Sequence, residues 1–238
     1  MKKRELHSLL SRAIRPYSML EHPFYQAWSA GRLSLDELCG YAREYYVHVR
    51  AFPTYLSLVH AGLDDPELRQ VVLRNLVEED LGADGVPDHL TLWLDFAEGL
   101  GLDRERVRQN PGLIGVRQAV AKFRGLSARS PLSGLAALYA YESQIPEVSA
   151  AKLEGLREYF GITDPKTTAY FRVHQEADIR HREEELELIA SLIQTPEDAA
   201  EAERAAEEGA EAAWSLLSAI CQAFCPHLME ETGQGARA

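Results

Sequence analysis

Signals that start and stop helices recur along these 238 residues, whereas the alternation typical of strands is almost absent. Ser34 with Glu37 forms a capping box, and the run at 65–67 places an N-cap aspartate before a first-turn proline and a first-turn glutamate. The run at 195–198, Thr-Pro-Glu-Asp, repeats this pattern. The sequence therefore predicts a single all-α domain over residues 1–238, a bundle of about seven or eight helices.

Seven segments carry the helical pattern, and two of them contain a proline in their interior. The segments are expected at about 34–62, 65–82, 87–100, 112–128, 131–160, 164–194 and 195–225. Pro53 predicts a kink in the first of them. Pro146 predicts loosening in the fifth, because proline has no N–H to donate to the carbonyl of Glu142. The chain from about residue 228 onward is expected to be a disordered tail.

Composition and charge exclude several classes of function. The net charge of −12 argues against a nucleic-acid partner, which would need many Lys and Arg side chains to replace phosphate counterions. No stretch approaches the roughly 20 apolar residues of a membrane span. The opening MKKRELHSLLSR lacks the apolar run of a signal peptide, and three cysteines are too few for a disulfide framework. We therefore expect a soluble, cytoplasmic protein.

The segment YFRVHQEADIRHREEE, residues 170–185, places ionisable side chains on an apolar helix face. His174, Asp178 and His181 follow one another at spacings of four and three, which align on one face of a helix. Phe171 and Leu188 share that face, so it is the one that a bundle buries. Buried imidazoles and carboxylates need hydrogen-bond partners or a metal. From spacing alone, both a hydrogen-bonded core network and a metal site remain open.

Two further helices place an acid on an apolar stripe. Glu142 lies in line with Leu138, and Glu79 lies in line with Leu76. Glu78 lies in line with Arg74 instead, and we expect these two residues to form a surface pair. Each acid alone is more often a core residue with hydrogen-bond partners than a metal ligand. Together, three carboxylates and three imidazoles suit two ions such as iron or manganese better than zinc, which usually takes four ligands. The candidate ligands are Glu79, His89, Glu142, His174, Asp178 and His181.

Longer motifs carry a resemblance to a known family. In chain order they are HPFY, YAREYYVHVRAFP, NLVEED, YAYESQIP, GLREYFG and AYFRVHQEADIRHREEE. On these motifs the chain is identified as a member of the haem-oxygenase-like dimetal oxidases, and it resembles the chlamydial branch that associates with death domains. The match runs from about Tyr17 to the end of the 164–194 helix. The resemblance implies a seven-helix bundle, a homodimer, and the six candidate residues as ligands of two metal ions.

The resemblance also implies an unusual reaction. Members of the chlamydial branch make 4-aminobenzoate, the aromatic part of folate, from one of their own tyrosines. The matching residue here is Tyr25 in LEHPFYQAW, and Lys152 in SAAKLEG matches the proposed donor of the amino group. Tyr41 and Tyr170 match further tyrosines near the site. The resemblance implies an Fe/Fe or Fe/Mn pair, with dioxygen and a reductant as co-substrates. From the residues alone, the tyrosines are ordinary core aromatics and Lys152 is an exposed helix lysine.

Three alternatives remain beside this hypothesis. The same scaffold could oxidise a diffusible substrate such as a fatty acid or an amino acid, although the presence of both Tyr25 and Lys152 favours self-sacrifice. A death-domain-binding module would give no reason for six inward-facing polar residues. A metal-free relative of the quinone-synthase type is disfavoured by the carboxylates. Cys221 and Cys225, with His227 nearby, are left without an assigned role.

Overall fold

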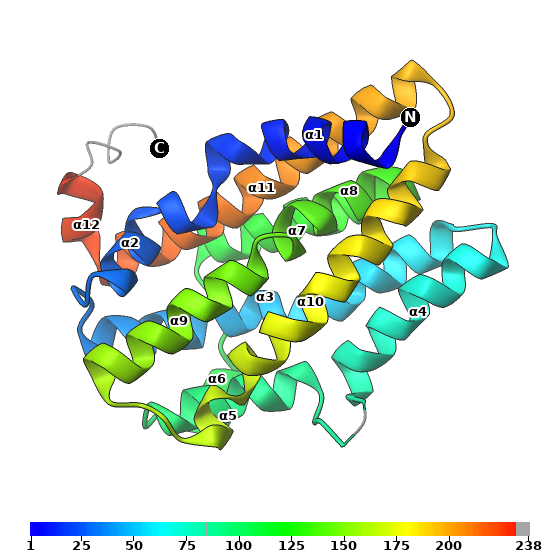
Figure 1. The fold of residues 1–238 in the computed structure, drawn as a ribbon. Helices are drawn as coiled ribbons and strands as arrows, with labels where there is room; N and C mark the ends of the chain where they lie inside the picture. The colour runs from blue at the N-terminus through cyan, green and yellow to red at the C-terminus, as the bar shows by residue number, and fades with distance from the viewer. Residues whose placement is uncertain (84, 232–238) are drawn as a thin grey trace.

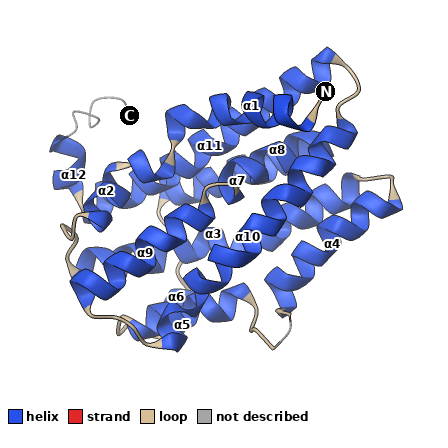
Figure 2. Ribbon diagram, in the orientation of Figure 1, coloured by secondary structure: helices blue, strands red, loops and turns tan. Residues whose placement is uncertain are grey.

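Helices are the regular elements of the chain in the computed structural model, which describes residues 1–83 and 85–231 (Figures 1 and 2). The expected all-α bundle is thus confirmed. Two short 3₁₀ helices, η1 (Arg15–Tyr17) and η2 (Met19–Glu21), lie between α1 and α2. The α-helices of the described residues are α1 (Lys3–Ile14), α2 (Pro23–Ser29), α3 (Leu35–Gly62), α4 (Pro66–Leu81), α5 (His89–Gly99), α6 (Arg104–Arg108), α7 (Ile114–Arg129), α8 (Pro131–Glu142), α9 (Ile145–Phe160), α10 (Pro165–Leu192), α11 (Pro196–Phe224) and α12 (Pro226–Glu231).

The predicted start signals form the caps of their helices. Ser34 and Glu37 make a reciprocal capping box at the start of α3. The side chain of Asp65 accepts hydrogen bonds from the first turn of α4, and the hydroxyl of Thr195 accepts one from the backbone N–H of Asp198 in α11. Helix α3 continues through Pro53. Local sequence chemistry therefore sets where the long helices begin.

Two expectations need correction. The segment expected as one helix over 131–160 is broken between Glu142 and Ile145, because Pro146 lies in the first turn of α9 and cannot donate to the preceding turn. The expectation of a disordered tail from about residue 228 is wrong for residues 228–231. Residues 226–231 form α12, in which Leu228 and Met229 are buried, and residues 232–238 lie outside the described part. Apolar side chains at these two positions explain why the chain stays packed.

Helix α1 is an element that the sequence prediction omitted. Leu6, Leu10 and Ile14 recur at a spacing of four and are buried, which is the pattern of an amphipathic helix. In Figure 1 this helix lies along α11, and the two helices are in contact. The segment was considered only as a possible targeting signal, so its periodicity was missed.

The centre of the bundle is built around α10, which packs against α5, α8 and α9. On another side, α11 packs against α7 and α8. A methyl group at Gly209 of α11 would lie 2.7 Å from the backbone of Ala137 in α8, so only glycine permits this close approach. The alanine-rich face of α11 thus brings it near α8, which supports the helix that ends at Glu142. No helix of the described residues is long and apolar enough to cross a lipid bilayer.

Candidate active site

The six ligand-type residues predicted from sequence come together in two buried groups of three. The first group takes one residue each from the end of α4, the start of α5 and the middle of α10: Glu79, His89 and His174. The second takes one residue from the end of α8 and two from α10: Glu142, Asp178 and His181. Within each group the ligand-type atoms lie within 4.8 Å of one another. Helices far apart in sequence therefore converge on one polar centre inside the core.

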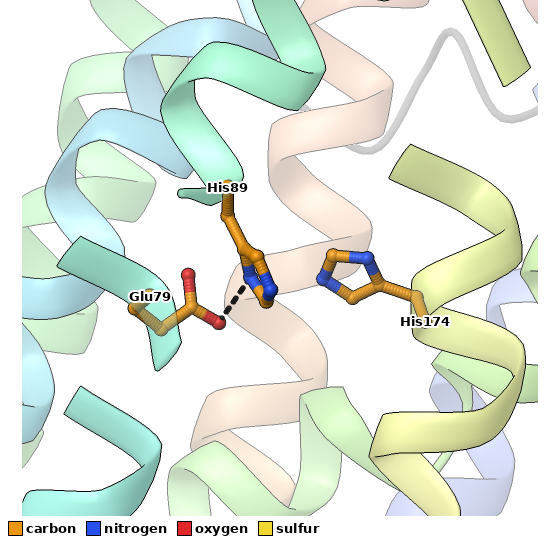
Figure 3. Close-up of side chains that lie close together, drawn as sticks. All are labelled: Glu79, His89 and His174. Atoms are coloured by element: carbon orange, nitrogen blue, oxygen red, sulfur yellow. Dashed lines mark ion pairs between the residues drawn. The ribbon is translucent and has the colours of Figure 1, made fainter. Parts of the chain in front are cut away.

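The turn between α4 and α5 sets the first group. Gly82 ends α4 with a φ of 73°, and a methyl group there would lie 2.1 Å from the carbonyl oxygen of Val86, so the turn requires glycine. Asp88 then caps α5 by accepting a hydrogen bond of 2.8 Å from the backbone of Thr91. His89 is consequently the first residue of α5 and faces back toward Glu79, as Figure 3 shows.

Three side chains of this first group point toward one another (Figure 3). His89 Nδ1 lies 2.7 Å from Glu79 Oε1, and the rings of His89 and His174 are 4.5 Å apart between centroids. His174 Nδ1 lies 2.7 Å from the carbonyl oxygen of Tyr170. A carbonyl can only accept, so Nδ1 carries the proton and Nε2 keeps its lone pair. Burial lowers the pKa of His174, which favours the neutral imidazole that binds metals.

The second group is organised around His181. Its Nδ1 lies 3.4 Å from Asp178 Oδ1 and 3.8 Å from Glu142 Oε2. Its Nε2 lies 3.0 Å from Glu78 Oε2, and Arg180 holds the same carboxylate at 2.7 Å. A carboxylate that accepts from one ring nitrogen directs the other nitrogen toward the site, as outer-sphere partners of metal-bound histidines do.

Burial and like charges perturb the acids of the second group. Burial raises the pKa of Glu142 and also that of Asp178, and neighbouring carboxylates add to both effects. Burial alone would lower the pKa of His181, but hydrogen bonds with Asp178 and Glu78 raise it to about 11. In the absence of an ion, a protonated His181 thus balances part of the negative charge. A bound cation would take over this role.

Unpartnered atoms test whether these residues fit metal ions. In the part of the chain that the structure describes, His89 Nδ1, Glu142 Oε2 and Asp178 Oδ2 are buried without a hydrogen-bond partner. The short contact from Glu79 to His89 is therefore not aligned as a hydrogen bond. Leaving a buried polar atom unpaired costs about 1–3 kcal/mol. Each group keeps at least one such atom directed at its centre, and carboxylates with imidazoles suit iron or manganese. The residues fit a pair of ions.

Comparison with known proteins agrees with this geometry. A family model described as "Iron-containing redox enzyme", of the haem-oxygenase-like type, matches residues 39–214. The chain belongs to this family. It is 41% identical over 221 residues to a 4-aminobenzoate synthase of Chlamydia pneumoniae, covering 92% of this chain and 96% of the relative. A 4-aminobenzoate synthase of Nitrosomonas europaea is 38% identical over 228 residues, with 92% of each chain covered. The resemblance noted from the sequence is confirmed.

A solved structure shows that the fold extends to distant proteins. A domain of unknown function with a haem-oxygenase-like fold from Shewanella denitrificans superposes with a TM-score of 0.78 at 19% identity. The match covers 98% of this chain and 96% of that domain. The bundle is therefore haem-oxygenase-like, and the chain is an oxidoreductase of the iron-containing redox enzyme family whose two ligand groups are suited to a dimetal centre.

In this redox enzyme, the predicted tyrosines lie in a buried aromatic cluster beside the ligand groups. The hydroxyls of Tyr25 and Tyr41 are 3.3 Å apart, and burial raises the pKa of both phenols. Tyr170 stacks on the ring of His174 with centroids 4.1 Å apart, and it meets Trp93 edge-on at 4.7 Å. Tyr170 thus connects the aromatic cluster to the first ligand group.

Lys152 is buried, unlike the exposed helix lysine that its sequence neighbours alone suggest. Its side chain lies in a box of five rings, with Nζ between 5.0 and 5.9 Å from the centroids of Tyr25, Tyr41, Tyr45, Trp93 and Phe171. No carboxylate of the described residues forms an ion pair with it, and burial moves its pKa well below the usual value. This shift favours the neutral, nucleophilic form of the Lys152 amine.

A second tyrosine pair was missed by the sequence analysis. The hydroxyls of Tyr45 and Tyr141 are 2.8 Å apart. Tyr141 belongs to YAYESQIP, directly before Glu142, but it was treated only as part of a motif. It lines a cavity of about 10 Å³ together with Glu79, Glu142, Tyr170, His174 and Asp178, among others. A cavity of this size has room for about one water-sized molecule.

Two acids near the second group were also missed. Glu78 is not a surface partner of Arg74, because it binds His181 and Arg180, while Arg74 lies 3.6 Å from Glu184. Glu185 continues the stripe of α10 one turn beyond His181 and is buried with both carboxylate oxygens unpartnered among the described residues. Its spacing was a usable signal, hidden in the run of three glutamates. Cys221 and Cys225 lie at the end of α11 and belong to neither ligand group.

Proposed function

We propose that this enzyme is a dimetal, oxygen-dependent synthase that makes 4-aminobenzoate from its own Tyr25, with the amino group taken from Lys152. The named activity of the Chlamydia and Nitrosomonas relatives supports this product. The carbon skeleton supports a tyrosine as the source of the product's carbon atoms. 4-Aminobenzoate consists of a six-membered ring and one further carbon, and so do the ring and Cβ of tyrosine. The Cα–Cβ bond of Tyr25 would break, and dioxygen would oxidise Cβ to the carboxylate. A ring C–N bond to the Lys152 nitrogen would replace the phenol C–O bond, and the Cε–Nζ bond of Lys152 would break to release the product.

The size of the cavity at the ligand groups is the observation that favours self-sacrifice over turnover of a diffusible substrate. At about 10 Å³ it leaves space for a molecule of the size of water or dioxygen, and none for a fatty acid or an amino acid. The organic reactant would instead be built into the wall of the site. Tyr25 and the amine of Lys152 lie together in the neighbouring aromatic cluster, 5.2 Å from ring centroid to Nζ, and Tyr170 connects this cluster to the first ligand group.

Glu79, His89 and His174 would hold one ion and Glu142, Asp178 and His181 the other, with Fe/Fe or Fe/Mn as the proposed pair. When bound, the ions would supply oxygen activation, with a reductant as electron source. The chain's own residues prepare the reactants. Tyr41 is placed to exchange a proton with the Tyr25 hydroxyl at 3.3 Å. The aromatic box excludes water and lowers the pKa of Lys152, which favours the neutral amine with an available lone pair.

The same resemblance leads us to propose a homodimer in the cytoplasm. A death-domain partner has less support, because the six inward polar residues have no role in such a module.

Substitution of single phenols tests the proposed function. Full-length protein is loaded anaerobically with Fe(II), or with Fe(II) and Mn(II), and then given oxygen and a reductant without any organic substrate. Wild type should release 4-aminobenzoate. Tyr25→Phe should bind metal and yield none, whereas Tyr55→Phe removes an equally buried phenol outside the Lys152 box and should retain activity. Product from Tyr25→Phe would refute the assignment of Tyr25.

A further inference from the structure

A second, larger cavity lies behind the second ligand group and takes no part in the proposed reaction. Its volume is about 240 Å³, and it lies between α1, η1, the junction of α8 with α9, and α10. Tyr139 and Ser143 line it on either side of Glu142 along the chain, and Arg182 lines it directly after His181. None of the six ligand-type residues lines it.

Basic side chains dominate the charged groups of this cavity. Arg15, Arg182 and His7 line it, and no acidic side chain does. Within residues 1–83 and 85–231, Arg15 forms no ion pair, and the one acid paired with Arg182 is Glu147 at a long 3.7 Å. The chain has a net charge of −12, but this cavity is lined by two arginines and by no acid, so it attracts anions.

The start of α9 adds to the positive potential. This helix of 16 residues begins at Ile145, directly after Gln144, which lines the cavity. Its N-terminus has no side-chain cap, because the amide of Gln144 is engaged elsewhere: Oε1 accepts from the backbone N–H of Met19 at 2.8 Å and Nε2 donates to the carbonyl of Ala140 at 2.8 Å. The dipole of α9 places partial positive charge beside Gln144, which favours a negative ligand in the adjacent cavity.

A buried phenol supplies an unused donor. Tyr139 is 1% exposed, lines the cavity, and its hydroxyl has no hydrogen-bond partner among the described residues. Burial raises the pKa of Tyr139 to about 12, so the hydroxyl keeps its proton at neutral pH. The hydroxyl lines the cavity and can donate a hydrogen bond to a ligand or water there.

We propose that this cavity binds a small organic or inorganic anion that carries a carboxylate or a phosphate group. Arg15 and Arg182 would pair with the anionic group, and the Tyr139 hydroxyl would donate a hydrogen bond to it. Ile14 offers apolar contact to the body of an organic ligand. The site contains no residue with a role in the proposed reaction, so its test is independent of the proposed function.

Titration of the full-length chain without added metal tests the proposal, with calorimetry as the readout. The probes are 4-aminobenzoate as the carboxylate, inorganic phosphate, and neutral 4-aminobenzamide, which has the shape of the first without its charge. At least one anion should bind saturably at one site per chain, and the amide should not. The probe that binds distinguishes a carboxylate ligand from a phosphate ligand.

Variants locate the binding. The double variant Arg15→Gln, Arg182→Gln should weaken binding at least about tenfold, since a hydrogen bond to a charged group contributes about 1.5–3 kcal/mol and 1.4 kcal/mol is tenfold. Tyr139→Phe keeps the ring and packing and should also weaken binding, so the result does not depend on the double variant folding. Arg12→Gln, an exposed arginine on α1, should bind as wild type. No saturable binding of either anion, or equal binding by Tyr139→Phe and wild type, would overturn the proposal.

Discussion

Replacing Lys152 by Met should make the folded chain more stable and remove a specific pH dependence. Lys152 lies among five aromatic rings, and burial holds its pKa well below the usual value, so the folded state releases a proton that the unfolded state keeps. Stability then rises with pH between the folded pKa and the unfolded value of about 10.4, by about 1.4 kcal/mol per pH unit. Met has a similar length and no charge to desolvate, so the stability of the variant lacks this dependence on pH.

The assay is denaturant unfolding of metal-free protein under nitrogen, from pH 7.5 to pH 9.5. The variant should be more stable throughout, and its advantage over wild type should shrink by about 2.5 kcal/mol across that range. Lys166→Met is the control. The hydrogen bond to Glu98 raises the pKa of the exposed Lys166 amine. Its contribution to folding stability is therefore lost only above the pKa of the unfolded state. The stability difference between Lys166→Met and wild type should stay constant below pH 9.5. An advantage of Lys152→Met that does not change with pH would refute a neutral, desolvated amine.

Further predictions concern the ligand groups. Fe(II) or Mn(II) should raise the melting temperature, because the ions bind the folded state, and Asp178→Asn should retain about one of two ions by metal analysis. Glu78→Gln should lower the affinity for one of the two ions by roughly 10–100-fold in chelator competition. Glu67→Gln, at an exposed position on the same helix, should leave the affinity unchanged. Glu185→Gln should increase the metal-free unfolding free energy by about 1–3 kcal/mol at pH 7. Because burial raises the pKa of Glu185, this gain in unfolding free energy should shrink as the pH falls toward about 4. The control Glu183→Gln, at an exposed position, should show no such gain.

Much of the fold follows from local chemistry in the sequence. Capping residues such as Ser34 and Asp65 act within one turn, so their effect is visible without knowledge of the tertiary structure. The stripe of His174, Asp178 and His181 was equally visible, since helical periodicity alone aligns the three residues. The six candidate ligands followed once acids on other helices were found on apolar faces, whereas their division into two groups of three comes from the structure.

What the sequence could not show depends on contacts between distant segments. Glu78 and Glu79 are neighbours in the chain, and only the position of α10 decides that Glu78 meets His181. Lys152 has no aromatic neighbours in the segment SAAKLEG, yet α2, α3, α5 and α10 place five aromatic rings around its side chain. Periodicity gives the direction of a side chain on its own helix, and it says nothing about which helix that side chain faces.

The yield of product per chain tests the central claim most directly. Protein made with ring-labelled tyrosine is loaded with metal and given oxygen and a reductant in an excess of unlabelled free tyrosine. The account predicts labelled 4-aminobenzoate that reaches a plateau at no more than about one molecule per chain, with the loss of the Tyr25 side chain visible by peptide mass spectrometry, because the reacting group is consumed rather than regenerated. Unlabelled product, or many molecules per chain with Tyr25 intact, would contradict it.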